Sequence, residues 1–232
     1  MATIKRIPNF KKNSFEDAVW AKNSLIAGVD EVGRGCLAGP VVVAAVILKQ
    51  STKNRLIKDS KLLDAQGLEK AYNYIVKNSW HATAVLNNNF IDKVNIYQAT
   101  LSGMRRASCQ LLATAPTPEL FVVDAMPLVL EHFNGDVVHF IYGEKKSISI
   151  AAASIVAKVT RDRIMRRHDV YFPGYNLARH KGYSTPGHKK MLSELSQSLL
   201  HRLTFIDHII DCGDEEFQEN FIQQEFNQEL SI

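Results

Sequence analysis

The sequence predicts an α/β protein: a mixed five-stranded sheet flanked by helices, with a helical region toward the C-terminus. Short β-rich runs that alternate with longer segments of helical periodicity carry this prediction. Residues 24–30 and 41–48 are two such runs joined by a Gly-rich turn, which is typical of an antiparallel pair. Residues 120–124 and 137–142 are largely apolar, as expected for parallel strands buried on both faces. The predicted sheet therefore combines both strand directions.

The remaining elements follow the same periodicities along the chain. Asp64 can cap a helix that presents apolar residues on one face as far as Ile75, and residues 80–86 alternate as the third strand. Three further segments are expected to be helical: 90–113, 148–167 and 189–199. The second of them carries the run AAAS near its start, and these small side chains allow close packing on a sheet. A loop-rich region with the sequences FPGYN and ARHKGYSTPGHKK separates the last two.

The expected organisation is a basic extension with an early helix over residues 1–23, one main domain over 24–210 and an acidic tail over 211–232. A chain of 232 residues with 46% hydrophobic residues can bury one sizeable core. The tail holds seven of the 24 acidic residues and none of the 28 basic ones, so residues 1–210 carry an excess of 11 basic residues. That excess favours a polyanion as partner, although many basic domains bind none. The tail itself fits either an amphipathic helix or a loose chain.

Composition also bears on where the protein acts. No apolar run approaches the ~20 residues that cross a bilayer, and VVVAAVIL over 41–48 has the length of a strand. The start, MATIKRIPNFKKN, is basic and lacks the apolar segment of a secretory signal. Cys36, Cys109 and Cys212 are widely spaced without a C-x-x-C pattern. This usage argues against a zinc site or a disulfide framework and predicts a reducing, cytoplasmic location.

The segment AGVDEVGRGCLAGP, residues 27–40, contains the strongest chemical signal. Asp30 and Glu31 end an apolar run directly before the turn Gly33-Arg34-Gly35. Two adjacent carboxylates at this position indicate that a positive group neutralises them, either a divalent cation or the guanidinium of Arg34. Glycines allow a backbone to approach a bulky ligand, and arginine suits a phosphate. The alternative is a capped strand end with a surface acidic pair.

Two further acids follow apolar runs that are expected to be strands. Asp124 ends the run at Val123, and Glu144 follows Tyr142-Gly143. If the strands are neighbours, the four acids converge at one edge of the sheet, where they repel each other unless divalent cations neutralise them. Oxygen-only ligands select Mg²⁺ or Mn²⁺, and a pair of such ions can hydrolyse a phosphodiester. Since successive strand residues face opposite sides, Asp30 and its neighbour are expected to share a site only through a break or bulge in the strand.

Seven blocks of the sequence occur in the order seen in ribonuclease HII, the type 2 ribonuclease H family: AGVDEVGRG, DSKLL, ATLSGMRRA, VVDAM, SIAAASIVAKVTRDRIM, HKGYSTPGH and HRLTF. Over residues 24–205 the sequence resembles that family. The resemblance implies an RNase H-like fold and a Mg²⁺- or Mn²⁺-dependent endonuclease that cuts the RNA strand of RNA–DNA hybrids. It also implies incision on the 5′ side of a single ribonucleotide embedded in duplex DNA, as ribonucleotide excision repair requires, by a protein expected to be a monomer.

The resemblance also implies roles for single residues. Asp30, Glu31 and Asp124 match the metal-binding acids of the family. One departure stands at the fourth acid: the family usually has Lys-Gly-Asp, and this chain has Tyr142-Gly143-Glu144. Because glutamate reaches one methylene further than aspartate, the second metal position is the part of the site that this change puts in question.

The substrate contacts implied by the resemblance come from three places. The turn Gly33-Arg34-Gly35 would read the ribose 2′-OH through backbone groups, and Tyr183 would stack beside the DNA nucleotide that follows the ribonucleotide. Lys61 is a candidate for a phosphate contact, although Asp59-Ser60-Lys61 also fits a plain turn and cap.

Other titratable residues are given ordinary roles. Asp162 is expected to have a structural or ion-pairing role, and Cys36 to pack without acting as a nucleophile. The three histidines His180, His188 and His201 are expected to lie at the surface or in loops. The glycines of GVDEVGRG do not indicate a dinucleotide loop, because its acids would face the pyrophosphate. The competing function is a non-catalytic module that binds hybrids and has lost turnover through the changed fourth acid.

Overall fold

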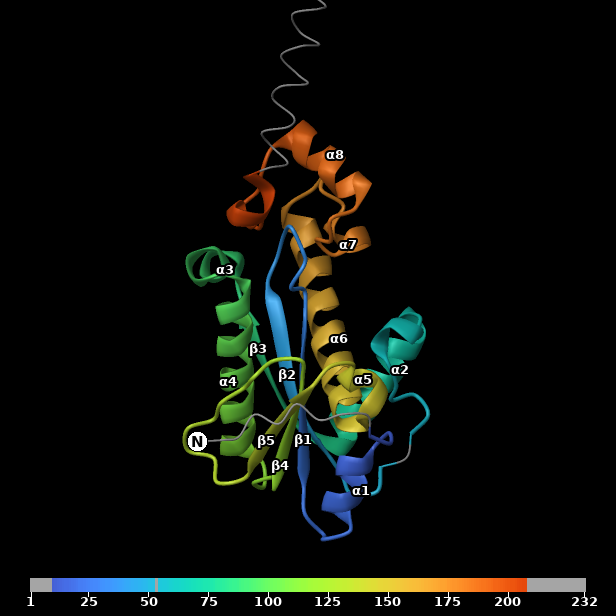
Figure 1. Cartoon of the computed structure of the whole chain (residues 1–232). Helices are drawn as coiled ribbons and strands as arrows, with labels where there is room; N and C mark the ends of the chain where they lie inside the picture. Colours follow the sequence, from blue (N-terminus) through green and yellow to red (C-terminus); the bar gives the residue numbers. More distant parts are fainter. Residues whose placement is uncertain (1–9, 53, 208–232) are drawn as a thin grey trace, which may run out of the picture. The chain divides into compact units, whose positions relative to one another are not determined.

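The computed structural model describes residues 10–52 and 54–207. Its centre is a five-stranded sheet in the order β3-β2-β1-β4-β5 (Figure 1). The strands are β1 (Ile26–Val32), β2 (Val41–Leu48), β3 (Ser79–Leu86), β4 (Leu120–Asp124) and β5 (Asp136–Phe140). The first three pair antiparallel, whereas β4 runs parallel to both β1 and β5. The predicted mixed sheet is confirmed, including its antiparallel first pair and its parallel pair β4 and β5. Of that parallel pair only β4 is largely buried, because β5 is the edge strand and stays partly exposed.

The helices flank this sheet and follow it. They are α1 (Ser14–Trp20), the 3₁₀ turn η1 (Ser60–Leu62), α2 (Ala65–Asn78), α3 (Asn88–Val94), α4 (Ile96–Thr114), α5 (Gly143–Lys146), α6 (Ile148–Tyr171), α7 (Leu177–His180) and α8 (Pro186–Leu195). Helix α4 covers one face of the sheet, and α2 and α6 cover the other (Figure 1). Within the described part of the chain, no helix has the length and apolar character that a membrane span requires.

Strand β2 is apolar throughout because both of its faces are covered. All eight of its residues are buried. Val42 and Val46 belong to a core cluster with α2 and α6, whereas Val43 faces Gly103 of α4 on the other side. On β1, a Cβ added to Gly28 would lie 2.1 Å from the backbone of Ser149. The start of α6 therefore lies directly on the strand that carries the first two acids.

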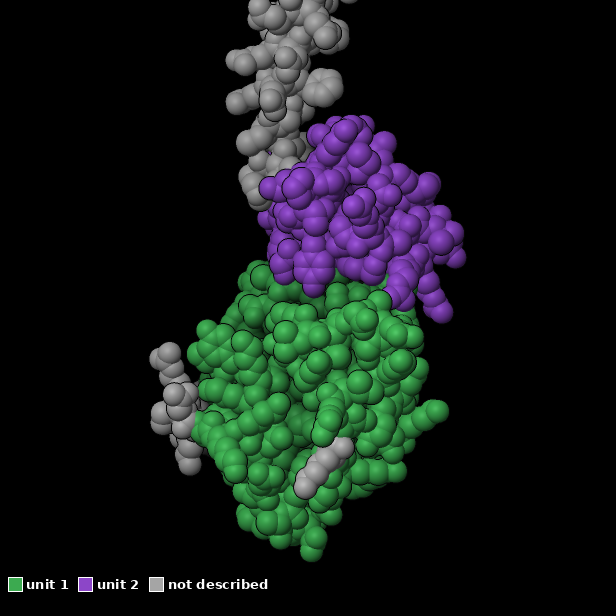
Figure 2. Space-filling view, turned by 90° about the vertical axis from the view of Figure 1, so that its right-hand side faces the viewer, with its two compact units in different colours: residues 1–34, 40–164 green, residues 35–39, 165–232 purple. Residues whose placement is uncertain are grey.

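The chain forms two compact units, coloured separately in Figure 2. Unit 1 comprises residues 1–34 and 40–164 and contains the whole sheet. Unit 2 comprises residues 35–39 and 165–232 and contains α7 and α8. Two β-bridges hold its short N-terminal segment, Cys36 with Tyr183 and Ala38 with His201. Unit 2 provides the predicted C-terminal helical region.

Several predicted boundaries are wrong, and local chemistry explains them. The helix expected over 90–113 is interrupted at Asn95, which has φ 67° and caps α4 by accepting from the amide of Gln98. Helix α8 begins at Pro186, because Thr185 caps its first turn, and it ends at Leu195. Helix α6 runs four residues beyond the expected end at 167. The predictions for the acidic tail lie outside the described residues.

Candidate active site

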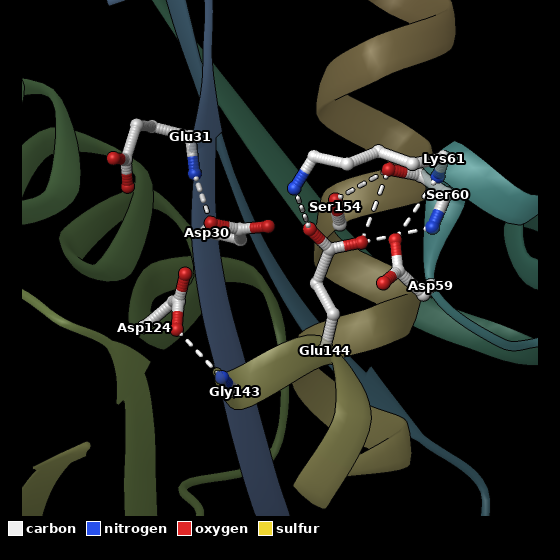
Figure 3. Close-up of polar contacts among 9 residues, drawn as sticks. All are labelled: Asp30, Glu31, Asp59, Ser60, Lys61, Asp124, Gly143, Glu144 and Ser154. Atoms are coloured by element: carbon white, nitrogen blue, oxygen red, sulfur yellow. Dashed lines mark hydrogen bonds and ion pairs between the residues drawn. The ribbon is translucent and has the colours of Figure 1, made fainter. Parts of the chain in front are cut away.

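Asp30 and Asp124 lie on neighbouring parallel strands at the same level of the sheet. Val29 of β1 pairs with Val123 of β4, so the two acids that follow are adjacent, and in Figure 3 their carboxylates lie close together. Asp30 is only 3% exposed. The backbone N–H of Gly143 donates to Asp124 Oδ1 at 2.7 Å. The convergence of these two acids, expected from the strand ends, is present.

Glu31 points away from Asp30, because β1 stays regular through both residues. Asp30 pairs with Ala44 and Glu31 with Val43 in an unbroken register, so the strand has no break or bulge that would turn both side chains to one side (Figure 3). Arg34 Nη1 donates to Glu31 Oε1 at 3.2 Å. The other carboxylate oxygen, Oε2, is buried and has no hydrogen-bond partner. Arg34 thus supplies part of the positive charge that the sequence calls for.

The sequence predicts Glu144 at the end of a strand, but the residue lies on the short helix α5. Strand β5 ends at Phe140, and Tyr142 adopts a left-handed conformation with φ 61° that turns the chain into α5. The Glu144 carboxylate is held on both oxygens (Figure 3). The backbone N–H and hydroxyl of Ser60 donate to Oε2 at 2.8 and 3.1 Å, and Lys61 Nζ donates to Oε1 at 3.2 Å. We call Asp30, Glu31, Asp124 and Glu144 the carboxylate cluster.

The DSK sequence forms a cap, as one of its two interpretations predicts. Asp59 Oδ1 accepts from the backbone N–H of Lys61 at 3.1 Å and caps η1. The same turn aims Ser60 and the lysine at Glu144, and the Ser60 hydroxyl also lies 3.1 Å from that of Ser154 on α6. Lys61 therefore pairs with the fourth acid, while its contact with a phosphate stays a prediction.

The carboxylate cluster concentrates negative charge out of water. Burial raises the pKa of Asp30 well above its usual value, and the charges of Glu31, Asp124 and Glu144 raise it further. Burial also raises the pKa of Glu31, to about 7, although Arg34 opposes the shift. For Asp124, too, burial is the main cause of a raised pKa. Arg34 and Lys61 balance only part of this negative charge, so the cluster favours an additional cation.

The residues present fit a divalent cation. All side-chain donors of the cluster are carboxylate oxygens, the ligands that Mg²⁺ and Mn²⁺ prefer. The unpartnered Oε2 of Glu31 and the mutual repulsion felt by Asp30 are both relieved by such an ion. Among residues 10–52 and 54–207, no three acidic, His or Cys side chains already surround one point. In the described residues the four acids are therefore near one another without forming a complete set of ligands around one point.

The two glycines of the turn differ in what surrounds them. Gly33 has φ +94°, and an added Cβ would lie 2.2 Å from Nε of Arg161, a fully buried side chain that donates to the carbonyl of Pro40 at 2.8 Å. An added Cβ on Gly35 would meet no described atom within 4 Å. Gly33 is thus required by the fold, whereas the space beside Gly35 is open to a ligand.

Tyr183 belongs to unit 2 and lies in the loop between α7 and α8. Its side chain is partly exposed, at 37%, and its backbone pairs with that of Cys36. Cys36 is fully buried, in agreement with the packing role predicted for it.

Sequence reasoning missed a buried acid near the site. Glu16 on α1 is fully buried, and its Oε1 accepts from the hydroxyl of Ser147 and, at 3.1 Å, from the backbone N–H of Ser149. It thereby anchors the junction of α5 and α6 just after Glu144. The predicted ion pair of Asp162 is confirmed, with Lys158 at 2.9 Å. The surface or loop position expected for His188 is wrong, since this residue is buried on α8. His201 lies outside the helices, at an isolated β-bridge, but it too is buried.

Comparison with known proteins identifies the family. The profile of one family, Ribonuclease HII, matches residues 27–208. The chain belongs to the ribonuclease HII family. Ribonuclease HII of Enterococcus faecalis is 43% identical over 208 residues, which cover 88% of this chain and 79% of the relative. Ribonuclease HII proteins are metal-dependent endoribonucleases, and this chain is an enzyme of that class.

Solved structures agree on the fold. The ribonuclease H2 from Pyrococcus horikoshii superposes with a TM-score of 0.68 at 24% identity, covering 84% of this chain and 99% of that one. Bst-RNase HIII in complex with Mn²⁺ gives a TM-score of 0.69 at 18% identity, covering 91% and 75% of the two chains. The RNase H-like fold implied by the sequence is confirmed.

Proposed function

We propose that this protein hydrolyses the RNA strand of RNA–DNA hybrids and incises on the 5′ side of single ribonucleotides embedded in duplex DNA. The observation that carries the proposal is the adjacency of Asp30 and Asp124 within a family match that spans residues 27–208. Adjacent acids, one buried and one half-buried, without a full counter-charge suit divalent cations better than they suit a packed core. Either Mg²⁺ or Mn²⁺ meets this requirement, and the Mn²⁺ complex of Bst-RNase HIII supports a manganese-competent site.

In this proposal the carboxylate cluster holds the cations. When bound, divalent cations activate the attacking water and stabilise the leaving oxygen of the phosphodiester. Asp30 and Asp124 are fixed by neighbouring strands, so their oxygens need little reorganisation. Glu31 offers its unpartnered Oε2 after rotation, and Glu144 joins when Ser60 and Lys61 release it.

In this proposal several residues outside the carboxylate cluster recognise the substrate. Arg34 is paired with Glu31 and provides a guanidinium, which suits a phosphate, beside the turn. The open space at Gly35 admits the ribose, whose 2′-OH distinguishes RNA from DNA. Tyr183 stacks on the sugar or base beyond the ribonucleotide, and Lys61 contacts a phosphate once it leaves Glu144. We also infer that the protein acts as a monomer, and that it acts in the cytoplasm, a location that its cysteine pattern favours.

The test is cleavage of duplex DNA that contains one ribonucleotide, with the cut position mapped and with Mg²⁺ and Mn²⁺ compared. Metal-dependent incision on the 5′ side of the ribonucleotide is expected, together with cleavage of a continuous hybrid. Metal-dependent binding of both duplexes without any cleavage would instead support the competing hypothesis of a non-catalytic hybrid-binding module.

A further inference from the structure

Three histidines of unit 2 form one cluster at the loop that carries Tyr183. His188 and His201 are 0% and 1% exposed, and their Nε2 atoms lie 3.1 Å apart. The ring of His180 stacks on that of His188, with centroids 4.0 Å apart and planes 20° from parallel. We call these three residues the histidine cluster. It lies away from the carboxylates of unit 1 in sequence, and the proposed hydrolysis does not use it.

The hydrogen-bond partners of the ring nitrogens fix the tautomers of the two buried histidines. Nδ1 of His201 accepts from the backbone N–H of Ser198 at 2.9 Å, so its proton is on Nε2 and points at His188. His188 therefore accepts on Nε2, and its Nδ1–H donates to the carbonyl of Tyr183 at 2.9 Å. A second proton on either ring would oppose an N–H with another N–H, so both rings are neutral.

His180 holds the same loop one residue earlier. Its Nδ1 accepts from the backbone N–H of Gly182 at 3.1 Å, and its Nε2–H donates to the carbonyl of Tyr175 at 2.6 Å. Gly182 itself has φ +80°, and an added Cβ would lie 2.3 Å from the carbonyl oxygen of Ala38. Imidazoles thus hold the loop backbone at two consecutive residues: His180 accepts from the N–H of Gly182, and His188 donates to the carbonyl of Tyr183.

This pattern indicates positioning. Every ring nitrogen already has a protein partner, so no lone pair of the cluster is left for a metal ion. The cluster also has no need of a ligand to neutralise it. Its hydrogen bonds form a chain from the backbone N–H of Ser198, through the rings of His201 and His188, to the backbone carbonyl of Tyr183, whose side chain is partly exposed. This relay of hydrogen bonds fixes the orientation of both rings.

We propose that the histidine cluster positions Tyr183 for its contact with the nucleic acid, with His201 orienting His188 and His188 holding the tyrosine backbone. The proposal rests on the role of Tyr183 in the proposed function. The histidines are positioning residues, because they act through the tyrosine and touch no reacting atom in this proposal.

Two substitutions of one residue test the relay. In His188→Asn the side-chain amide nitrogen replaces Nδ1–H and can still donate to Tyr183, whereas in His188→Gln the amide replaces Nε2 and keeps only the contact with His201. Single-turnover cleavage is measured on a duplex with one ribonucleotide and on a continuous hybrid. We expect His188→Gln to lower the cleavage rate on the single-ribonucleotide duplex by about threefold to tenfold and to change the rate on the hybrid little. His188→Asn should retain most of the cleavage activity on both substrates.

A double variant shows whether the effect passes through the tyrosine. In a Tyr183→Ala background, His188→Gln should cause no further loss, because the contact that it would misplace is already gone. Equal losses on both substrates, equal losses for Asn and Gln, or additive losses in the double variant would each overturn the proposal. So would a Tyr183→Ala enzyme that cuts the two substrates in the wild-type ratio. Absence of any cleavage by the wild-type protein would instead overturn the proposed function, and this proposal with it.

A spectroscopic measurement tests the cluster without reference to activity or to the folding of a variant. Imidazole ¹⁵N chemical shifts of the wild-type protein at neutral pH should show neutral rings. The proton should be on Nε2 in His180 and His201 and on Nδ1 in His188. A charged ring or a different tautomer for His188 would overturn the relay whatever the variants do.

Discussion

The carboxylate cluster of unit 1 and the histidine cluster of unit 2 both take titratable side chains out of water, yet their polar atoms are satisfied to different degrees. Mutual repulsion contributes to the raised pKa of Asp30, and a buried oxygen of Glu31 has no partner. In the histidine cluster each ring nitrogen has a protein partner, and the two buried rings, His188 and His201, are neutral. Buried polar groups are normally satisfied, so the first cluster is incomplete without a ligand and the second is complete as it stands.

Glu144 shows where this distinction needs a test within one cluster. It belongs to the carboxylates by position, but both of its oxygens have donors in Ser60 and Lys61. In having a hydrogen-bond partner for every polar side-chain atom, Glu144 resembles the histidines. Its role in metal binding therefore depends on whether a cation competes with the lysine, which mutation can decide.

The largest effect is expected for Asp124→Asn, which removes a charge from the unsatisfied cluster. Cleavage should fall by about a hundredfold or more, because charge stabilisation of the reacting phosphodiester is lost. Hybrid binding, measured by fluorescence anisotropy, should change little, because in the proposed site this residue holds a metal rather than the duplex. Asp162→Asn is the matched control, since that acid pairs with Lys158 on α6. Activity above about a tenth of the wild-type rate would contradict a metal-ligand role for Asp124.

A smaller and selective effect is expected for Tyr183→Ala in unit 2. Stacking on one residue is worth ~1–3 kcal/mol, so cleavage at a single embedded ribonucleotide should fall roughly tenfold or more. Cleavage of a continuous hybrid should fall less. Tyr171→Ala, which removes an aromatic ring that is 77% exposed in the same unit, serves as control. Equal losses on both substrates would show that Tyr183 only supports its loop.

For Glu144, the two substitutions Gln and Asp separate charge from reach. Glu144→Gln should lower Mg²⁺-dependent activity several-fold, because the amide cannot supply a negative ligand. Glu144→Asp should preserve or improve activity, because the shorter carboxylate no longer reaches Ser60 and Lys61 and is free for a cation. Activity is titrated against Mg²⁺ for each enzyme. If the Gln variant matches the wild type at all concentrations, Glu144 does not belong to the metal site.

The sequence predicted those parts of the site that regular strands determine. Asp30 and Asp124 could be placed together because parallel neighbours in a sheet align their carboxyl ends, and the register of Val29 with Val123 does so. The break or bulge that would let Asp30 and Glu31 face one site is not present, since β1 keeps its pairing with β2 through Val32. If both acids bind the same metal site, the Glu31 side chain must therefore reach it by rotation and not by a change in the strand.

What the sequence could not give depends on contacts between distant residues. Glu16 accepts hydrogen bonds from Ser147 and Ser149 at the start of α6, more than 130 positions away, and no local sequence pattern predicts such partners. The spacing of the histidines fits no metal site and so predicts surface or loop positions, yet the burial and tautomer of each ring are decided by the groups that surround it. His188, for example, meets the carbonyl of Tyr183 on one side and His201 on the other. Position in the chain carries no information about either contact.

The last prediction concerns stability in the metal-free protein, where the two clusters should respond to pH with opposite signs. Burial raises the pKa of Glu31 from 4.5 to about 7, so its stabilising protonated form is lost as pH rises through that window. Burial lowers the pKa of His201 from 6.5 to about 4, so its contribution is present above 6.5 and is lost as pH falls toward 4. Glu31→Gln should therefore be more stable than the wild type at the alkaline end, and His201→Gln less stable there.

The measurement is the thermal midpoint of the wild type and of these two variants, in EDTA, across the window from acid to neutral pH. Both variants should converge on the wild type in acid, where Glu31 is protonated and His201 begins to lose its advantage. Toward neutral pH they should diverge from it in opposite directions, each by at least about 2 °C. The sign is the informative part, because replacing a group in an unsatisfied cluster relieves the fold and replacing one in a satisfied cluster harms it. Midpoints that shift in the same direction for both variants would show that the two clusters do not differ in the way their hydrogen bonds indicate.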